Sequence, residues 1–206
     1  MYIPRLNRVT DTALIHQFMQ RFSFATLVTV EDGIPVATHL PFMLDPAAGE
    51  HGTLIAHVAR ANPQWKAFDQ QREVLVIFQG DHTYISPSWY EAAPANVPTW
   101  NYMTVHAYGV PQIIEDQPQM VAMLDRLVNK YEQAYPKPWQ MALSDADMQT
   151  MLQAIVAFEI PITRLEGKFK LSQNRSTEDQ QRVVAALAGS GDPMAQAVGR
   201  EMAKHL

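Results

Sequence analysis

The sequence has no cysteine among its 206 residues. Disulfides, Cys-ligated zinc, iron–sulfur clusters and thiol nucleophiles are therefore excluded for this chain. Long apolar runs are also missing, since the strongest one, Val74 to Phe78, is far too short to cross a bilayer. The first residues, Met1 to Arg5, lack the apolar stretch of a signal peptide. We therefore expect a cytoplasmic protein without a membrane partner.

Positive charge is in the minority, with 16 Lys+Arg against 21 Asp+Glu and a formal net charge of −5. Nucleic-acid-binding proteins usually carry a basic footprint, and the chain as a whole has none. Hydrophobic residues make up 47% and charged residues 18% of the sequence. This composition is typical of a folded globular protein rather than a disordered one.

Short strands dominate the first half of the chain. Pro35 and Pro41 fall inside one of them. Because proline cannot donate to a sheet ladder, this predicts either an edge position or a strand that is interrupted near a site. The turn at Glu31-Asp32-Gly33 predicts a hairpin with the strand before it. The expected strands are 24–30, 34–43, 53–57, 73–79, 83–86 and 101–108, with 113–114 continuing beyond Pro111.

Helices are expected at the start of the chain and again in its second half. Leu14, Phe18 and Phe22 lie on one helical face after a cap at Thr10 or Asp11. Further helices are predicted over 62–68 and 117–135, and another begins after Ser144. A pair of short helices is predicted from Ser176 onward, separated at 189–191. A late strand is predicted over 157–171. Strands followed by helices predict an α+β fold built on a small antiparallel barrel.

Several segments are dense in His, Asn, Trp, Tyr and Ser, among them Ile85 to Tyr90 and Val97 to Gly109. With Lys170 to Arg175, they closely resemble the PaiB-like family of FMN-binding negative transcriptional regulators, over nearly the whole chain. The resemblance implies an antiparallel split β-barrel of the flavin-reductase and pyridoxamine-phosphate-oxidase type with peripheral helices. It also implies FMN as cofactor, a homodimer and a regulatory role. Asp81 departs from the family pattern and places a negative charge beside a candidate site.

The resemblance divides the chain into an FMN-binding split-barrel domain over 1–175 and a C-terminal helical extension over 176–206. The first domain includes a helical insertion at about 117–155. The extension is expected to pack on the barrel or on a partner subunit.

Arg60 follows a predicted strand and precedes a helix N-terminus, which is the polarity that an anion prefers. By the resemblance, the FMN phosphate is assigned to His57, Arg60 and Asn62. The blander interpretation makes Asn62 a helix cap and Arg60 a surface charge. The remaining cofactor-binding residues implied by the resemblance are Thr26, Leu27, His39, Leu40, Pro41, Trp100, His106, Lys170 and Gln173.

Two lysines, Lys168 and Lys170, point to the same face of a predicted strand. They could meet a phosphate of FMN or nucleic acid, or they could protect a solvated edge strand. Trp100, Tyr102 and His106 are expected at or near the subunit interface.

Four histidines lie in the dense segments: His39, His57, His82 and His106. Converging imidazoles could bind a metal or haem, but no two of them have ligand spacing along the sequence, so no metal ligand is assigned. The C-terminal helix pair resembles a helix–turn–helix in outline but carries more acidic than basic residues, which makes direct DNA binding doubtful. A flavin-dependent oxidoreductase, a haem or metal barrel, and a barrel without cofactor remain as alternatives.

Overall fold

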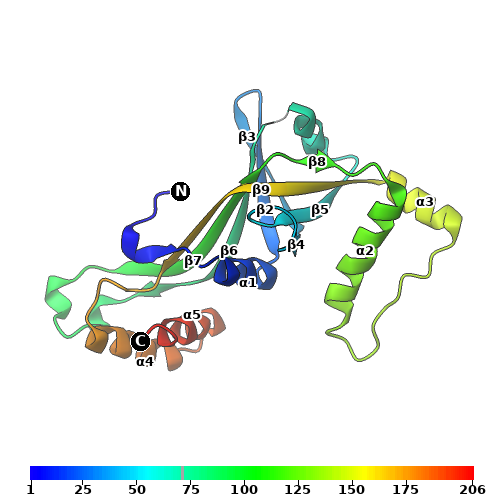
Figure 1. Cartoon of the computed structure of the whole chain (residues 1–206). Coiled ribbons are helices and arrows are strands. Elements are labelled where there is room, and N and C mark those ends of the chain that lie inside the picture. Colours follow the sequence, from blue (N-terminus) through cyan, green and yellow to red (C-terminus); the bar gives the residue numbers. More distant parts are fainter. Residues whose placement is uncertain (71) are drawn as a thin grey trace. The chain divides into compact units, whose positions relative to one another are not determined.

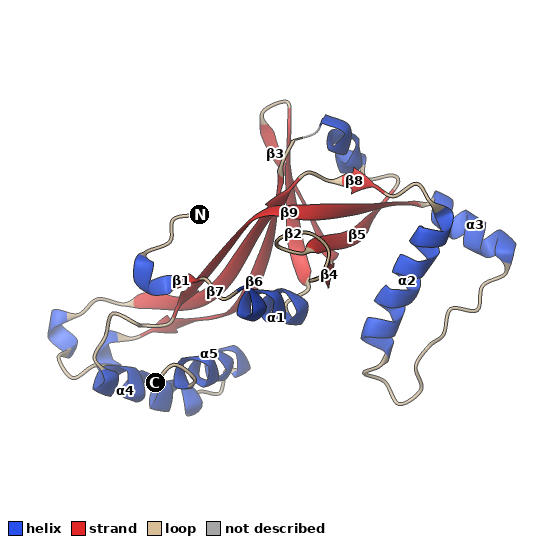
Figure 2. Cartoon of the chain, in the orientation of Figure 1, coloured by secondary structure: helices blue, strands red, loops and turns tan. Residues whose placement is uncertain are grey.

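The computed structural model describes residues 1–70 and 72–206. Its strands form an antiparallel sheet flanked by helices (Figures 1 and 2). The hydrogen-bonded order is β3-β2-β6-β7-β9-β5-β4, with β1 and β8 paired to β9, and the path ends at β3 and β4 instead of closing. The bounds are β1 Arg8–Val9, β2 Phe24–Glu31, β3 Ile34–Pro41, β4 Met43–Asp45, β5 Thr53–Ala59, β6 Val74–Ile85, β7 Thr99–Gly109, β8 Gln112–Ile113 and β9 Ile155–Lys170.

Five α-helices and four short 3₁₀ segments accompany these strands in the described residues. They are α1 Thr12–Arg21, α2 Gln117–Glu132, α3 Asp145–Gln153, α4 Thr177–Ala188 and α5 Pro193–Ala203, with η1 Arg5–Asn7, η2 Pro63–Gln70, η3 Pro87–Trp89 and η4 Ala93–Ala95. The open antiparallel sheet with helices at its periphery confirms the predicted α+β split barrel. None of the helices in residues 1–70 and 72–206 is long and apolar enough to cross a membrane.

The residues group into two compact units by their mutual contacts. Unit 1 comprises Met1–Phe18, Phe78–His106 and Glu166–Leu206, and unit 2 comprises Met19–Ile77 and Ala107–Leu165. Strands β6, β7 and β9 contribute residues to both units.

In unit 2 the predicted hairpin is present as β2 and β3, joined by a turn at Asp32 and Gly33 with positive φ angles of 50° and 80°. The prolines of β3 correctly predicted an edge strand, because β3 ends the strand order. β3 stops at Pro41 because the Phe42 amide donates to the Ser23 carbonyl and the Phe42 ring is buried. The predicted strand 34–43 is therefore two strands, β3 and β4.

Helices α2 and α3 of unit 2 cover a hydrophobic cluster with β4 and β9. Asp116 and Ser144 cap their N-termini, each side chain accepting a backbone N–H. The Ser23 and Tyr131 hydroxyls lie 2.8 Å apart and connect α2 to the start of β2. The buried residues of the cluster are Met43, Ile114, Met120, Met123, Leu124, Leu152 and Ala157.

In unit 1 helices α4 and α5 lie side by side (Figure 1). Gly199 allows the close approach, since a Cβ there would lie 3.0 Å from the Leu187 Cβ. The fully buried Asn101 of β7 donates to the Ser172 hydroxyl and to the Met202 sulfur. The C-terminal helices thus pack on the β7 segment of their own unit.

Other predicted elements also differ from those observed. The segments 73–79 and 83–86 form one strand, β6, because the polar residues between them pair within the sheet instead of turning. The helix predicted over 62–68 is a 3₁₀ segment, η2. The helix predicted to reach Tyr135 ends at Glu132.

Candidate functional site

The predicted site residues fall into two groups, one in each unit. Eight lie in unit 2, namely Thr26, Leu27, His39, Leu40, Pro41, His57, Arg60 and Asn62, and four lie in unit 1, namely Trp100, His106, Lys170 and Gln173.

On the β2–β3 hairpin, Thr26 is paired directly with His39, so their side chains share one face of the sheet. Leu27 and Leu40 are buried, with 0% and 5% of their surfaces exposed. Leu27 is also paired on both sides, with Thr38 and Val76, so these leucines lie in the core beneath the candidate site. Pro41 closes the hairpin opposite Phe24.

The turn between β5 and η2 is attached to β3 through Asn62. Its Oδ1 accepts from the Gln64 amide at 3.0 Å, and its Nδ2 donates to the Thr38 hydroxyl at 2.9 Å. Asn62 is therefore a turn cap, as the blander interpretation has it. The same contacts place the Arg60–Asn62 turn beside β3.

Gln64 was missed by the sequence reasoning. Its side chain is fully buried, and Nε2 lies 3.1 Å from both the Thr29 hydroxyl and the Val36 carbonyl. Among the described residues, its Oε1 has no hydrogen-bond partner. Gln64 thus fixes η2 against the β2–β3 hairpin. No local sequence pattern predicts such a contact, because its partners are about thirty residues away in the sequence.

Arg60 is held in place by backbone carbonyls. Its Nε donates to Gln153 and its Nη2 to Ile155, both at 2.8 Å. The guanidinium lies 5.8 Å from the Trp65 ring, whose indole N–H donates to the Arg60 carbonyl. In the described part of the chain, Nη1 has no protein acceptor, so a fixed cation retains free donor capacity.

A cavity of about 310 Å³ opens beside Arg60. This size is at the lower end of the range for small-molecule sites, about 300–1,000 Å³. The polar part of its wall includes Glu115, which precedes α2, and Gln117, the first residue of α2; Trp65 of η2 adds an aromatic ring. The other lining residues are Ile113, Ile114, Met120, Leu152, Gln153, Val156 and Ala157. The cavity therefore combines an apolar wall with one cation and one carboxylate.

His57 lies on β5 opposite Ala157. Burial lowers the pKa of its imidazole below the ordinary value. His57 is therefore neutral at neutral pH, and it could serve an anion as a hydrogen-bond donor rather than as a charge.

In unit 1, Trp100 is 52% exposed on β7. Its ring lies 6.1 Å from the rings of both His82 and Tyr84. A cavity of about 330 Å³ is lined by Gln79, His82, Trp100, Tyr102, Met103 and Thr104. An aromatic wall of this kind suits a planar ligand.

His106 lies further along the same face of β7. Burial lowers the pKa of its imidazole, and the positive α-amino group of Met1 lowers it further, while Glu166 acts in the opposite direction. That α-amino group donates to the Glu166 carboxylate at 2.6 Å.

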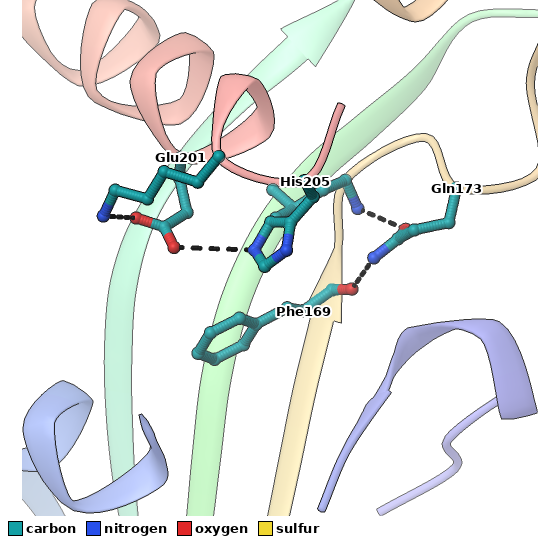
Figure 3. Close-up of polar contacts among 6 residues, drawn as sticks. Phe169, Gln173, Glu201 and His205 are labelled. Atoms are coloured by element: carbon teal, nitrogen blue, oxygen red, sulfur yellow. Dashed lines mark hydrogen bonds and ion pairs between the residues drawn. The ribbon is translucent and has the colours of Figure 1, made fainter. Parts of the chain in front are cut away.

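Lys170 and Gln173 lie at the end of β9. The Lys170 ammonium donates to the Thr99 hydroxyl at 2.6 Å and to the Trp100 carbonyl at 2.5 Å. The Gln173 amide is used within its own turn, where Oε1 accepts from the Leu171 amide and Nε2 donates to the Phe169 carbonyl (Figure 3). Gln173 therefore shapes this turn, and Lys170 retains a proton for another acceptor.

The alternative of a metal site needs a cluster of ligating side chains. Within residues 1–70 and 72–206, no three His, Asp or Glu side chains are placed to hold a metal ion.

Comparison with known proteins shows to which family this chain belongs. A family model described as "Putative FMN-binding domain" matches residues 1–164. The chain belongs to this FMN-binding family. FMN, the cofactor expected from the sequence, is the cofactor of the family.

A curated relative of the FMN-binding chain is the "Protease synthase and sporulation protein PAI 2" of Bacillus subtilis. The two are 39% identical over 204 residues, which is 98% of this chain and 96% of the relative. This relative confirms the predicted PaiB-like resemblance.

Two solved structures show the fold. The flavocytochrome Anf3 of Azotobacter vinelandii has a TM-score of 0.62 at 16% identity, covering 87% of this chain and 78% of that one. The FAD and heme binding protein of Mycobacterium smegmatis has a TM-score of 0.57 at 18% identity, covering 89% and 80%. At these identities the likeness shows the split-barrel architecture alone.

The residues of unit 2 fit one part of FMN, its phosphate. A phosphate monoester needs a cation with several N–H donors, and a guanidinium is well shaped for this task. Arg60 supplies one in a fixed position beside the cavity.

Proposed function

We propose that the chain is an FMN-binding split-barrel protein of the PaiB-like type that holds the FMN phosphate at the Arg60 turn. The observation that carries the proposal is the guanidinium of Arg60, fixed by the Gln153 and Ile155 carbonyls at the edge of the 310 Å³ cavity. Pre-positioning lowers the ordering cost of binding an anion. When bound, FMN supplies electron or hydride transfer chemistry.

The other unit 2 residues have defined tasks in this proposal. Asn62 holds the turn against β3, and neutral His57 donates a hydrogen bond. Thr26, His39 and Pro41 provide the edge along which the flavin lies, and the buried Leu27 and Leu40 support this edge from the core.

We also propose a homodimer and a negative regulatory role in transcription, as the resemblance to the PaiB-like family implies. Regulation in this proposal does not require direct contact with DNA. Two basic residues of helices α4 and α5 already face carboxylates, Arg182 with Glu91 at 3.7 Å and Lys204 with Glu201 at 2.7 Å. A helix that reads DNA needs such cations for phosphate contacts.

The test is a titration with FMN and with riboflavin, which lacks the phosphate, followed by absorption difference spectra. For Arg60→Met we expect FMN affinity to fall about ten- to a hundredfold, the value of a charge-assisted hydrogen bond. Riboflavin affinity should remain unchanged. Glu115→Gln removes a carboxylate from the cavity wall and should strengthen FMN binding.

Lys66→Met, the loss of an exposed lysine from η2, is the matched control and should leave both affinities unchanged. Equal weakening of FMN and riboflavin by Arg60→Met would show that Arg60 acts only through the fold. A Soret band in the purified protein, or no response to FMN, would contradict the proposed cofactor assignment.

A further inference from the structure

Unit 1 contains a group of three cations, Lys168, Lys170 and Arg175. Lys168 and Lys170 alternate along β9 and so share one face, and Arg175 follows in the next turn. In the described residues, none of the three forms an ion pair; Arg175 donates to the Asn96 side-chain oxygen. Glu166, on the same strand, is occupied by the α-amino group of Met1.

Lys168 is buried, with 9% of its surface exposed. Its ammonium lies 5.7 Å from the Tyr2 ring and 5.2 Å from the Tyr102 ring. Ring faces offset part of the cost of removing an ammonium from water, but they do not replace a counter-anion. An anion that reached Lys168 would therefore supply the negative charge that the two rings do not.

Lys170 is in a similar position. Its two hydrogen bonds to Thr99 and Trp100 involve neutral acceptors, so its charge stays uncompensated. Burial, and then the charges of Lys168 and Arg175, lower the pKa of its ammonium. An anion at this position would remove the mutual repulsion of the three cations.

Trp100 connects these cations to the aromatic cavity. Its carbonyl accepts from Lys170, while its ring lines the 330 Å³ cavity with His82 and Tyr102. The position next to the cations therefore favours an anionic group of a ligand, and the neighbouring cavity favours an aromatic ring.

We propose that unit 1 carries an anion site of its own, in which Lys168, Lys170 and Arg175 bind the phosphate of an aromatic phosphate ester and the Trp100 cavity takes its ring. The site shares no residue with the Arg60 site in unit 2, so it does not rest on the proposed function. Two sources supply this chemistry: FMN itself, or a second mononucleotide.

The experiment is calorimetric titration of the full chain with AMP and, separately, with inorganic phosphate. We expect AMP to bind more tightly than phosphate, because its base fills the cavity. Lys168→Met and Lys170→Met should each weaken AMP binding about tenfold, the value of one charge-assisted contact. Trp100→Ala should reduce AMP affinity to that of phosphate and leave phosphate affinity unchanged.

Lys137→Met, an exposed lysine in another part of the chain, is the control for loss of one positive charge. Lys168→Arg and Lys170→Arg keep the charge and should retain AMP binding. These two variants separate loss of the site from loss of the fold, which circular dichroism checks independently.

Repeating the AMP titration with saturating FMN identifies the source. Unchanged AMP affinity supports a second mononucleotide, whereas displacement of AMP together with weaker FMN binding in Lys170→Met supports FMN. The proposal is overturned if the lysine variants bind AMP, phosphate and FMN as the wild type does. It is also overturned if AMP and phosphate do not bind and the lysine variants leave FMN affinity unchanged. Failure of Arg60→Met to weaken FMN binding overturns only the proposed function.

Discussion

At the scale of single residues, the candidate sites depend on side chains that also hold the fold. Arg60 fixes the end of α3 through two backbone carbonyls and offers its remaining donors outward. Asn62 caps a turn and attaches it to Thr38. Such residues bind a ligand with little loss of side-chain entropy, because folding has already ordered them.

The buried histidines make stability depend on pH. Burial lowers the pKa of His57 and His106 below the ordinary value of 6.5, so the unfolded chain binds more protons than the folded chain just below that pH. The free energy of unfolding should therefore be largest above pH 6.5 and decrease as the pH falls through it. Urea unfolding at about pH 7.5 and about pH 5.5 measures this loss.

His57→Gln should lose less stability on acidification than the wild type, since one of the two buried imidazoles is gone. A His57→Gln variant that loses as much as the wild type would show that His57 does not contribute.

At the scale of elements, close backbone contact fixes where strands β7 and β9 meet in unit 2. A Cβ added at Gly109 would lie 2.2 Å from the Pro161 carbonyl oxygen, which is closer than any real contact. A side chain at this position must therefore push β9 away from β7.

Gly109→Ala should destabilise the chain by about 1–3 kcal/mol, the usual cost of overpacking. Gly191→Ala is the matched control, because a Cβ there meets nothing within 4 Å and the backbone angle is not positive. Its stability should stay within about 0.5 kcal/mol of the wild type. Equal urea midpoints for the two variants would contradict the contact.

Elements with a local signal were predictable from the sequence. Ser144 indicated the start of α3, and Asp32-Gly33 indicated the hairpin. β6 was split in the prediction because Gly80-Asp81-His82 has the composition of a turn, whereas pairing with neighbouring strands keeps it extended.

The candidate site was predictable only in part, for the same reason. The turn containing Arg60 and Asn62 has a strand-to-helix signal of its own. Gln64 and the Lys168–Tyr102 contact join segments far apart in sequence, which no local pattern encodes. Gln173, which the resemblance assigns to the cofactor, uses its amide in its own turn, and only the backbone geometry reveals this contact.

At the scale of the whole molecule, exposed aromatic side chains point to self-association. Trp100 is 52% and Tyr84 46% exposed, and their rings are in contact. Apolar surface of this kind commonly marks an interface, and two-fold dimers are the most common closed assembly.

Light scattering at micromolar concentration should therefore give twice the chain mass of 23.2 kDa. Tyr84→Lys places a charge in the exposed aromatic patch and should shift the protein toward the monomer. Tyr135, which is 61% exposed in unit 2, provides the control Tyr135→Lys, which should remain dimeric. A monomeric wild type would contradict the proposed homodimer.

The two tryptophans at the candidate sites have an optical consequence. Trp65 lies against Arg60 in unit 2, and Trp100 lies beside the lysines in unit 1, so each site contains its own indole fluorophore. Flavins absorb light in the region where indoles emit, so a bound flavin quenches a nearby indole by energy transfer. Replacing one tryptophan at a time with phenylalanine would show which indole a bound flavin quenches first, directly in the protein emission and without a labelled ligand.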